Sequence, residues 1–168
     1  MSAHAQPQVI ADAAAKLGCS AIAFTYNDPI IFHEYASDIA QACRQQGVRS
    51  GAVTAGYISE AARPDFFKYL DVANVDLKAF TDDFYRKITK SELQPMLETL
   101  MCLVQETDVW VAIANLVIPG ENDSKREFEE MTAWIVDNLG PDVPVIFPRF
   151  ILTIGCWNTR ARRRRPSP

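Results

Sequence analysis

Side chains that could bind a charged ligand follow four short apolar runs of this sequence. Residues 25–29 read Thr-Tyr-Asn-Asp-Pro, residues 54–57 read Thr-Ala-Gly-Tyr, residues 76–78 read Asp-Leu-Lys, and residues 119–123 read Pro-Gly-Glu-Asn-Asp. A carboxylate attracts a cationic amino group, and a lysine ammonium attracts a carboxylate. Glycines let a ligand approach the backbone closely. Together these residue types indicate a pocket for a small polar ligand that carries both charges.

Each of these residues also has a purely structural interpretation. Asp28 precedes a proline, as a helix N-cap often does, and Asp123 and Ser124 fit a loop and a cap. Lys78 is harder to explain as structure because it stands in an apolar stretch, where an ammonium needs a partner or a function. Asp76 lies two residues earlier, on the same face of a strand, and could be that partner. The sequence leaves both interpretations open.

Alternating helices and strands must position these stretches. Apolar runs of strand length alternate with helical stripes, and short loops join them, which predicts a parallel sheet with right-handed crossovers. The strands are apolar on both faces, as in sheets covered by helices. The βα unit repeats about five times, so we expect an α/β fold, a partial (β/α) barrel, with the candidate stretches at the carboxyl ends of its strands. We expect strands at residues 21–25, 51–54, 72–77, 109–118 and 143–147, and helices beginning near Val9, Pro29, Arg63, Thr81, Pro95 and Ser124. The second helix should carry Ile31, Tyr35, Ile39 and Cys43 on one apolar face. We expect Phe24, Phe32, Trp110 and Trp134 to lie in the core.

Length and composition bound the class of protein. The 168 residues suffice for one domain with its own core, and 48% hydrophobic with 23% charged residues is typical of a globular protein. No apolar run approaches the ~20 residues of a membrane span, and residues 1–14 lack the apolar segment of a secretion signal. We therefore expect a cytoplasmic protein without membrane contact. No Gly-x-Gly-x-x-Gly or P-loop motif is present to suggest nucleotide binding.

Potential metal ligands are few and scattered. The cysteines form no Cys-x-x-Cys pair, and without a secretion signal we expect reduced, buried thiols. The two histidines are far apart, so we expect no metal site built from this chain alone. The residues concerned are Cys19, Cys43, Cys102, Cys156, His4 and His33.

Charge is distributed unevenly along the chain. Six of the 17 basic residues are arginines within residues 146–168, which contain no acid, so residues 1–145 combine 11 bases with 21 acids and carry a charge of −10. A basic tail on an acidic body could suit a nucleic acid. However, no aromatic residue interleaves with the arginine cluster and no nucleic-acid-binding motif accompanies it, so we expect no nucleic-acid partner.

Five stretches of the sequence, taken together, resemble one enzyme family. They read FTYNDPIIFHEYA, VTAGYI, NVDLKAFTDDFYRK, DVWV and LVIPGENDS, within about residues 8–145. Their order and spacing resemble the radical S-adenosylmethionine (SAM) enzyme of the AmmeMemoRadiSam system, a group similar to pyruvate formate-lyase activating enzymes. The resemblance implies a partial (β/α) barrel, SAM and a 4Fe-4S cluster as cofactors, and reductive cleavage of SAM to methionine and a 5′-deoxyadenosyl radical. It also implies Memo-like and AMMECR-like proteins as partners.

Three of these stretches would hold SAM, according to the same resemblance. Residues 26–29 stand where relatives carry Gly-Gly-Glu-Pro, whose backbone carbonyls and acid receive the SAM ammonium. Residues 54–56 correspond to the next strand end, near the methionyl and ribose parts of SAM. Residues 76–78 match a motif whose lysine meets the SAM carboxylate. The implied cofactor-binding residues are Tyr26, Asn27, Asp28, Thr54, Gly56, Asp76 and Lys78, and no residue is implied as a metal ligand.

The sequence departs from the family pattern at both ends. It contains no Cys-x3-Cys-x2-Cys, the loop that supplies three thiolates to the cluster near the family's first strand. We therefore expect a fragment that lacks this first strand, is inactive by itself and, because its sheet edges are unpaired, is unstable or insoluble alone.

The arginine-rich tail has a genetic interpretation. Relatives continue their last strand into a His-Phe-x-x-x-His-Pro-Asp-Tyr type of segment, which is absent here. Residues 146–168 can be back-translated into codons that, one nucleotide out of phase, read HFSPLHPDYRMLEHPRPPPPTLA. We therefore expect residues 1–145 to form the radical SAM partial barrel and residues 146–168 to be an out-of-frame, poorly ordered tail.

Two other functions remain open. Lys78 at a barrel strand end could be the Schiff-base nucleophile of a cofactor-independent lyase if burial favoured its neutral form. The chain could also be a non-catalytic SAM-binding or interaction module.

Overall fold

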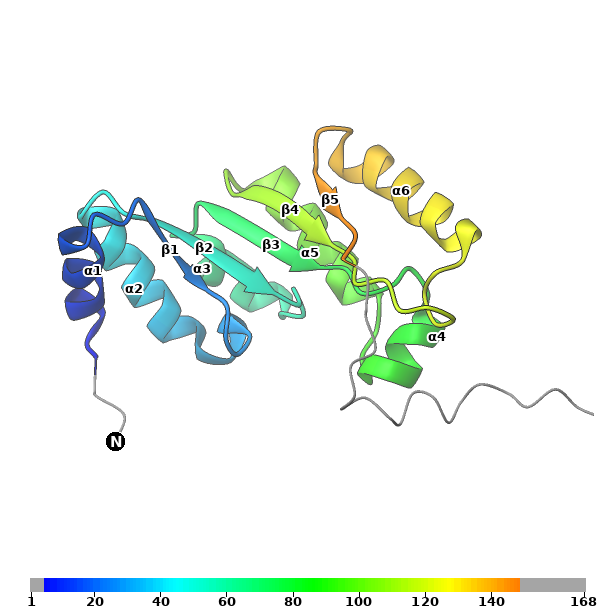
Figure 1. The fold of residues 1–168 in the computed structure, drawn as a ribbon, viewed down its shortest axis with the longest axis horizontal. Coiled ribbons are helices and arrows are strands. Elements are labelled where there is room, and N and C mark those ends of the chain that lie inside the picture. Colours follow the sequence, from blue (N-terminus) through cyan, green and yellow to red (C-terminus); the bar gives the residue numbers. More distant parts are fainter. Residues whose placement is uncertain (1–4, 149–168) are drawn as a thin grey trace, which may run out of the picture.

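A computed structural model describes residues 5–148, in which five parallel strands form one sheet with the order β1-β2-β3-β4-β5 (Figure 1). Each strand neighbours the next one in the sequence, so the predicted α/β fold with repeated βα units is confirmed. The strands are β1 (Ala21–Phe24), β2 (Arg49–Thr54), β3 (Val72–Asp76), β4 (Trp110–Ala114) and β5 (Val145–Ile146). The helices are α1 (Pro7–Lys16), α2 (His33–Gln45), α3 (Arg63–Phe67), α4 (Asp82–Phe84), α5 (Gln94–Glu106) and α6 (Lys125–Leu139). Short turns of 3-10 helix, η1 (Pro29–Phe32) and η2 (Glu60–Ala62), and a π-helical turn, η3 (Tyr85–Thr89), complete the chain.

The helix starts follow the capping residues of the sequence. Asp28 accepts a hydrogen bond from the Ile30 N–H over 3.2 Å at the start of η1, and the Ser124 hydroxyl accepts one from the Glu127 N–H over 3.2 Å at the start of α6. Gly140, with a φ of 96°, ends α6. The chain therefore turns where the sequence predicts.

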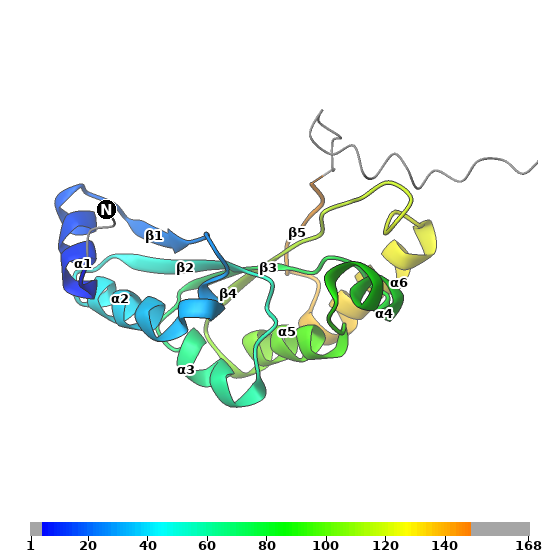
Figure 2. The same ribbon diagram turned by 90° about the horizontal axis from the view of Figure 1, so that it is seen from below.

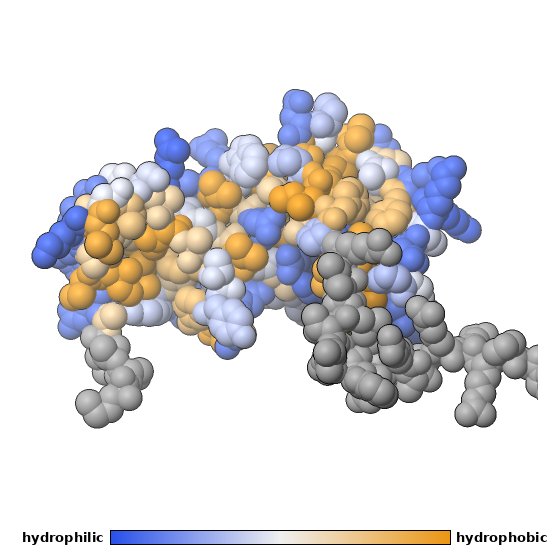
Figure 3. Space-filling model, in the orientation of Figure 1, coloured by the Kyte–Doolittle hydropathy of each residue, from blue (hydrophilic) through white to orange (hydrophobic). Residues whose placement is uncertain are grey.

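The helices lie on one face of the sheet only. Figure 2 shows α2, α3 and α5 below the strands, with the opposite face free of helices. Burial alternates accordingly: Ala73 and Val75 of β3 are buried on the helical side, whereas Asn74 between them is half-buried. Within residues 5–148 the sheet therefore has the form of a barrel wall with helices on its outer face, as the predicted partial (β/α) barrel requires. In Figure 3 hydrophobic colour is visible over α1 and beside β5.

The strand expected at residues 109–118 is shorter than predicted. β4 ends at Ala114, opposite Asp76, the last residue of β3. Beyond this point its backbone pairs with the segment after β5, from the Asn115 N–H to the Ile146 carbonyl over 2.9 Å and from the Val117 N–H to the Pro148 carbonyl over 2.8 Å. The β-branched residues therefore continue an extended segment after the sheet itself has ended.

The expected apolar stripe of the second helix is only partly correct. Ile39 and Cys43 are buried, but Ile31 is 77% exposed and Tyr35 is 39% exposed. The first turn after Pro29 is 3-10 helix, with about three residues per turn, so its residues do not continue the stripe of an α-helix.

Two expectations about buried side chains are also wrong. Cys19 is exposed and Cys102 is half-buried, while only Cys43 is buried, and burial raises the pKa of its thiol. All three are free thiols; Cys156 lies outside the described residues. Trp110, expected in the core, is 56% exposed because it belongs to the bare face of the sheet. The predicted out-of-frame segment lies outside the described residues from Arg149 onward.

Candidate functional site

The candidate stretches meet at one edge of the sheet, because the carboxyl ends of parallel strands point the same way (Figure 1). Residues 25–28 follow β1, residues 55–57 follow β2 and residues 77–78 follow β3. Pairing of Phe24 with Ala52 and of Thr54 with Val75 sets these ends side by side. We call this edge, with Tyr26, Asn27, Asp28, Thr54, Gly56, Asp76 and Lys78, the strand-end site.

Asp28 fastens the end of β1 to the end of β2. Its Oδ1 accepts hydrogen bonds from the Thr54 hydroxyl over 2.7 Å and from the Ile30 N–H over 3.2 Å, and its Oδ2 accepts the Ala55 N–H over 2.7 Å. A carboxylate offers about four acceptor positions, so one position on Oδ2 remains for a ligand. Asp28 therefore has mainly a structural role, as its capping interpretation suggested, and its carboxylate keeps one acceptor position for a ligand.

Gly56 and Thr54 shape the site from behind. The Gly56 φ of 67° disfavours other residues, and a Cβ here would lie 2.8 Å from Val75 Cγ1 and 3.4 Å from Met96 Sδ. The Gly56 N–H donates to the Thr54 hydroxyl over 3.0 Å, and Thr54 is 2% exposed. Both residues are buried, so the Thr54 hydroxyl and the positive φ of Gly56 set the backbone path and do not face a ligand.

Asp76 and Lys78 form the ion pair that the sequence allowed. Lys78 Nζ lies 2.7 Å from Asp76 Oδ2, and their side chains are 38% and 34% exposed. Lys78 stands two residues beyond β3, so its ammonium lies outside the apolar strand. An ammonium has three donors, and Asp76 uses one of them in this pair. The pair orients the ammonium and leaves it accessible to a second anion.

Two buried asparagines hold the backbone that carries Lys78. The Asn122 side-chain amide donates to the Lys78 carbonyl over 2.6 Å and to the Leu116 carbonyl over 2.9 Å. The Asn115 amide donates to the Leu77 carbonyl over 2.7 Å. Both asparagines are at most 2% exposed. Sequence reasoning placed Asn122 on the rim but gave Asn115 no role, because it read Asn115 as the interior of a long strand.

Tyr85 and Glu127 complete this support. The Tyr85 hydroxyl accepts the Lys78 N–H over 3.2 Å, and burial raises the pKa of Tyr85 to about 12. Glu127 Oε1 accepts the Phe80 N–H over 2.7 Å. The Ser124-x-x-Glu127 pattern resembles a capping box, yet the Glu127 carboxylate binds the chain after β3 instead of the helix start. Nothing in the sequence signalled this use.

Tyr26 and Asn27 lie on the solvent side of the site. Tyr26 is 91% exposed and Asn27 is also exposed. Neither side chain forms a hydrogen bond with the rest of residues 5–148. They are therefore free to contact a ligand or a partner.

The described residues do not fit an iron–sulfur cluster by themselves. Cys19 follows α1, Cys43 lies in α2 and Cys102 lies in α5. Within residues 5–148, no three side chains among His, Cys, Asp and Glu are grouped so that they could hold a metal ion. The same part of the chain contains no helix of the length and hydropathy needed to cross a membrane.

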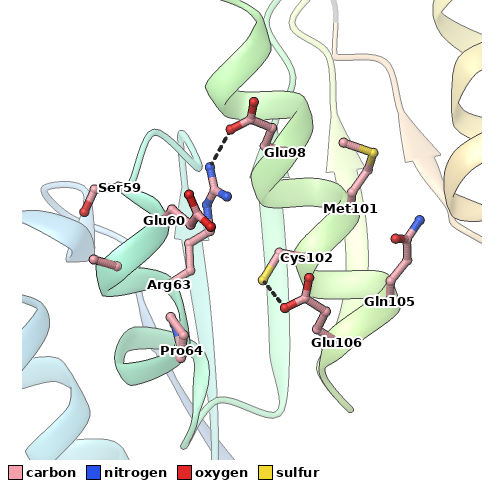
Figure 4. Close-up of a pocket in the computed structure, with 10 residues that line it drawn as sticks. Ser59, Glu60, Arg63, Pro64, Glu98, Met101, Cys102, Gln105 and Glu106 are labelled. Atoms are coloured by element: carbon pink, nitrogen blue, oxygen red, sulfur yellow. Dashed lines mark hydrogen bonds and ion pairs between the residues drawn. The ribbon is translucent and has the colours of Figure 1, made fainter.

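A separate groove of about 900 Å³ lies between η2, the start of α3 and α5 (Figure 4). Arg63 is 7% exposed there, and it forms an ion pair with Glu98 at 3.3 Å and donates to the Thr99 hydroxyl over 3.1 Å. The Cys102 thiol lies 3.7 Å from Glu106. None of the residues of the strand-end site lines this groove, which belongs to the covering helices.

Known proteins resemble this chain in both sequence and fold. Residues 4–135 match the sequence profile described as the Radical SAM superfamily. An uncharacterized protein of Methanocaldococcus jannaschii is 32% identical over 144 residues, which are 86% of this chain and 42% of that protein. The pyruvate formate-lyase-activating enzyme of Clostridium pasteurianum is 27% identical over 118 residues, which are 70% of this chain and 48% of that enzyme. The chain thus spans less than half the length of these two relatives.

A solved structure shares the fold. A domain of a pyruvate-formate lyase-activating enzyme from Bacteroides vulgatus superposes with a TM-score of 0.65 at 18% sequence identity, and the match covers 75% of this chain and 76% of that domain. At this identity the likeness supports the architecture of the sheet and its helices.

Proposed function

Because this chain belongs to the radical SAM superfamily, we propose that its strand-end site binds the methionine end of SAM. SAM, when bound in such enzymes, supplies a 5′-deoxyadenosyl radical after one-electron reduction. The observation that carries the proposal is the placement of one accessible ammonium, Lys78, beyond the end of β3 and one partly available carboxylate, Asp28, beyond the end of β1, on either side of β2. The methionine end of SAM presents the complementary charges.

Each residue of the site has a distinct part in this proposal. Lys78, oriented by Asp76, receives the carboxylate of SAM. The open position on Asp28 Oδ2 and the backbone carbonyls of residues 26–27 receive its amino group. Thr54 and Gly56 fix the course of the chain after β2, between the segments that carry Asp28 and Lys78.

We also propose a role for the whole protein. Relatives with activating activity suggest that it is an activase of the glycyl-radical type, and the sequence resemblance favours the AmmeMemoRadiSam system with Memo-like and AMMECR-like partners in the cytoplasm. Residues 1–145 would form the SAM-binding unit. Because the printed sequence contains no Cys-x3-Cys-x2-Cys, residues 1–168 alone should bind SAM without cleaving it.

The Schiff-base alternative receives no support from the site. A lyase of that kind needs a neutral amine in an apolar pocket, whereas Lys78 is 38% exposed and lies 2.7 Å from a carboxylate. That pairing suits an ammonium that binds an anion.

Calorimetric titration with SAM tests the proposal. Wild-type chain should bind SAM, Lys78→Met should weaken binding about tenfold or more through loss of a charge-assisted contact, and Lys87→Met should bind as wild type. Lys87 is the matched control because it is an exposed lysine of η3 that is paired with Asp83 and does not contact Asp76 or Asp28. Equal SAM affinity in the two variants would contradict the assignment of Lys78. Incubation under reducing conditions should yield no 5′-deoxyadenosine from residues 1–168.

A further inference from the structure

A second hollow, of about 530 Å³, opens beside the strand-end site. Its lining comes from the loop after β2 and from the corner that joins η3 to α5. Tyr57 directly follows Gly56 of the strand-end site, is 46% exposed and lines the hollow from the β2 side. We call this the Tyr57 hollow; it is lined by Tyr57, Arg86, Lys90, Ser91 and Glu92.

The corner that forms the Tyr57 hollow is built on the residue that supports Lys78. The Tyr85 hydroxyl accepts the Lys78 N–H, and the Tyr85 carbonyl accepts the Thr89 hydroxyl over 2.8 Å and the Ser91 N–H over 3.1 Å. The hydroxyls of Thr89 and Ser91 lie 2.7 Å apart. The buried Tyr85 thus connects Lys78, the proposed ligand of the SAM carboxylate, to the wall of the hollow. Tyr85 begins the π-helical turn η3, and such turns often occur at functional positions.

The hollow is positively charged in an acidic protein. It combines Arg86 and Lys90 with one acid, Glu92, while residues 1–145 carry a charge of −10. Arg86 is 66% exposed and its Nη2 lies 3.9 Å from Glu92 Oε1, a distance that leaves most guanidinium donors unused. Lys90 has no ion-pair partner among residues 5–148.

The backbone at Lys90 is unusual. Its φ of 60° and ψ of 34° are left-handed, a conformation that costs a residue other than glycine about 1 kcal/mol. Hydrogen bonds of Thr89 and Ser91 on either side hold the corner in this shape. The fold thereby fixes the backbone from which the Lys90 side chain reaches the hollow.

We infer that the Tyr57 hollow binds a carboxylate of the molecule that is presented to bound SAM. This inference rests on the proposed function, because the hollow acquires a substrate role only if SAM occupies the neighbouring strand ends. An arginine fork and a lysine ammonium together bind a carboxylate, and an aromatic ring packs against the carbon skeleton that bears it. The carboxylate could belong to an acidic peptide or to a small organic acid, and both are tested.

The test uses two probes on the 168-residue chain. One is a fluorescein-labelled Gly-Glu-Tyr-Glu-Gly peptide followed by fluorescence anisotropy, with Gly-Lys-Tyr-Lys-Gly as the matched probe of opposite charge. The other is succinate followed by calorimetry. The variant Arg86→Gln/Lys90→Gly removes both cations, and glycine suits the left-handed φ at residue 90. Lys87→Gln is the control, because Lys87 lies in the same turn but pairs with Asp83.

At least one carboxylate probe should bind the wild-type chain, and binding should weaken about tenfold in the double variant and change less than about twofold in the control. Preference for the peptide identifies a protein substrate, and preference for succinate identifies a small acid. Equal binding of the probe by wild type and the double variant overturns the inference. If the wild-type chain binds SAM but neither probe, the inference is overturned and the proposed function stands. If the wild-type chain binds a probe but does not bind SAM, the proposed function is overturned.

Discussion

Replacing Thr54 by valine should destabilise the strand-end site, because it removes a hydrogen bond that joins the ends of β1 and β2. The Thr54 hydroxyl donates to Asp28 Oδ1 over 2.7 Å and accepts the Gly56 N–H over 3.0 Å, and valine keeps the shape of the side chain while removing both bonds. A hydrogen bond to a charged acceptor contributes about 1.5–3 kcal/mol, and an unpaired buried N–H costs about 1–3 kcal/mol. We expect Thr54→Val to lower the free energy of unfolding by about 3 kcal/mol.

Urea denaturation followed by circular dichroism measures this loss. Thr54→Ser is the matched control, because serine keeps the hydroxyl and removes one buried methyl group, at a cost of about 1 kcal/mol. The affinity for SAM should fall in the valine variant and remain near wild type in the serine variant. If Thr54→Val lowers the free energy of unfolding no more than Thr54→Ser does, the hydrogen bond between Thr54 and Asp28 does not hold the strand ends together.

Three further outcomes follow from the described contacts. Gly56→Ala should destabilise the fold by about 2 kcal/mol or more, since its Cβ would lie 2.8 Å from Val75 and its φ is positive; an unchanged urea midpoint would refute this. Burial raises the pKa of Tyr85 from 10.0 to about 12, so the folded state holds this proton more tightly than the unfolded chain. The contribution is complete below pH 10 and disappears as the pH rises towards 12, and Tyr85→Phe should flatten that part of the stability profile. An aromatic disulfide reagent should modify exposed Cys19 before buried Cys43, as mass spectrometry of the modified peptides can show.

The sequence could predict the strand-end site because the relevant signals are local. Strand-length apolar runs followed by Asp28, Gly56 and Lys78 mark the carboxyl ends of β1, β2 and β3, and parallel pairing brings such ends together. The Asp76–Lys78 ion pair could also be predicted from a local signal, because residues two apart in an extended chain share a face.

The support behind Lys78 could not be predicted, because its contacts join distant segments. Asn122 reaches the Lys78 carbonyl across 44 positions, and Glu127 reaches the Phe80 N–H across 47 positions. A capping-box pattern specifies where a helix begins, but only the packed structure decides which N–H the Glu127 carboxylate accepts. The exposure of Trp110 was not predicted either, because an apolar residue of a strand looks the same in the sequence whether or not its face of the sheet is covered.

The most direct measurement is the pattern of amide chemical-shift changes when SAM is added to the isotope-labelled chain. Ligand binding at the strand ends predicts that the largest changes occur at Ala55, Gly56 and Lys78, and that they diminish in Lys78→Met. Changes confined to the groove between α3 and α5, or no changes at saturating SAM, would contradict the central claim that this edge of the sheet binds the cofactor.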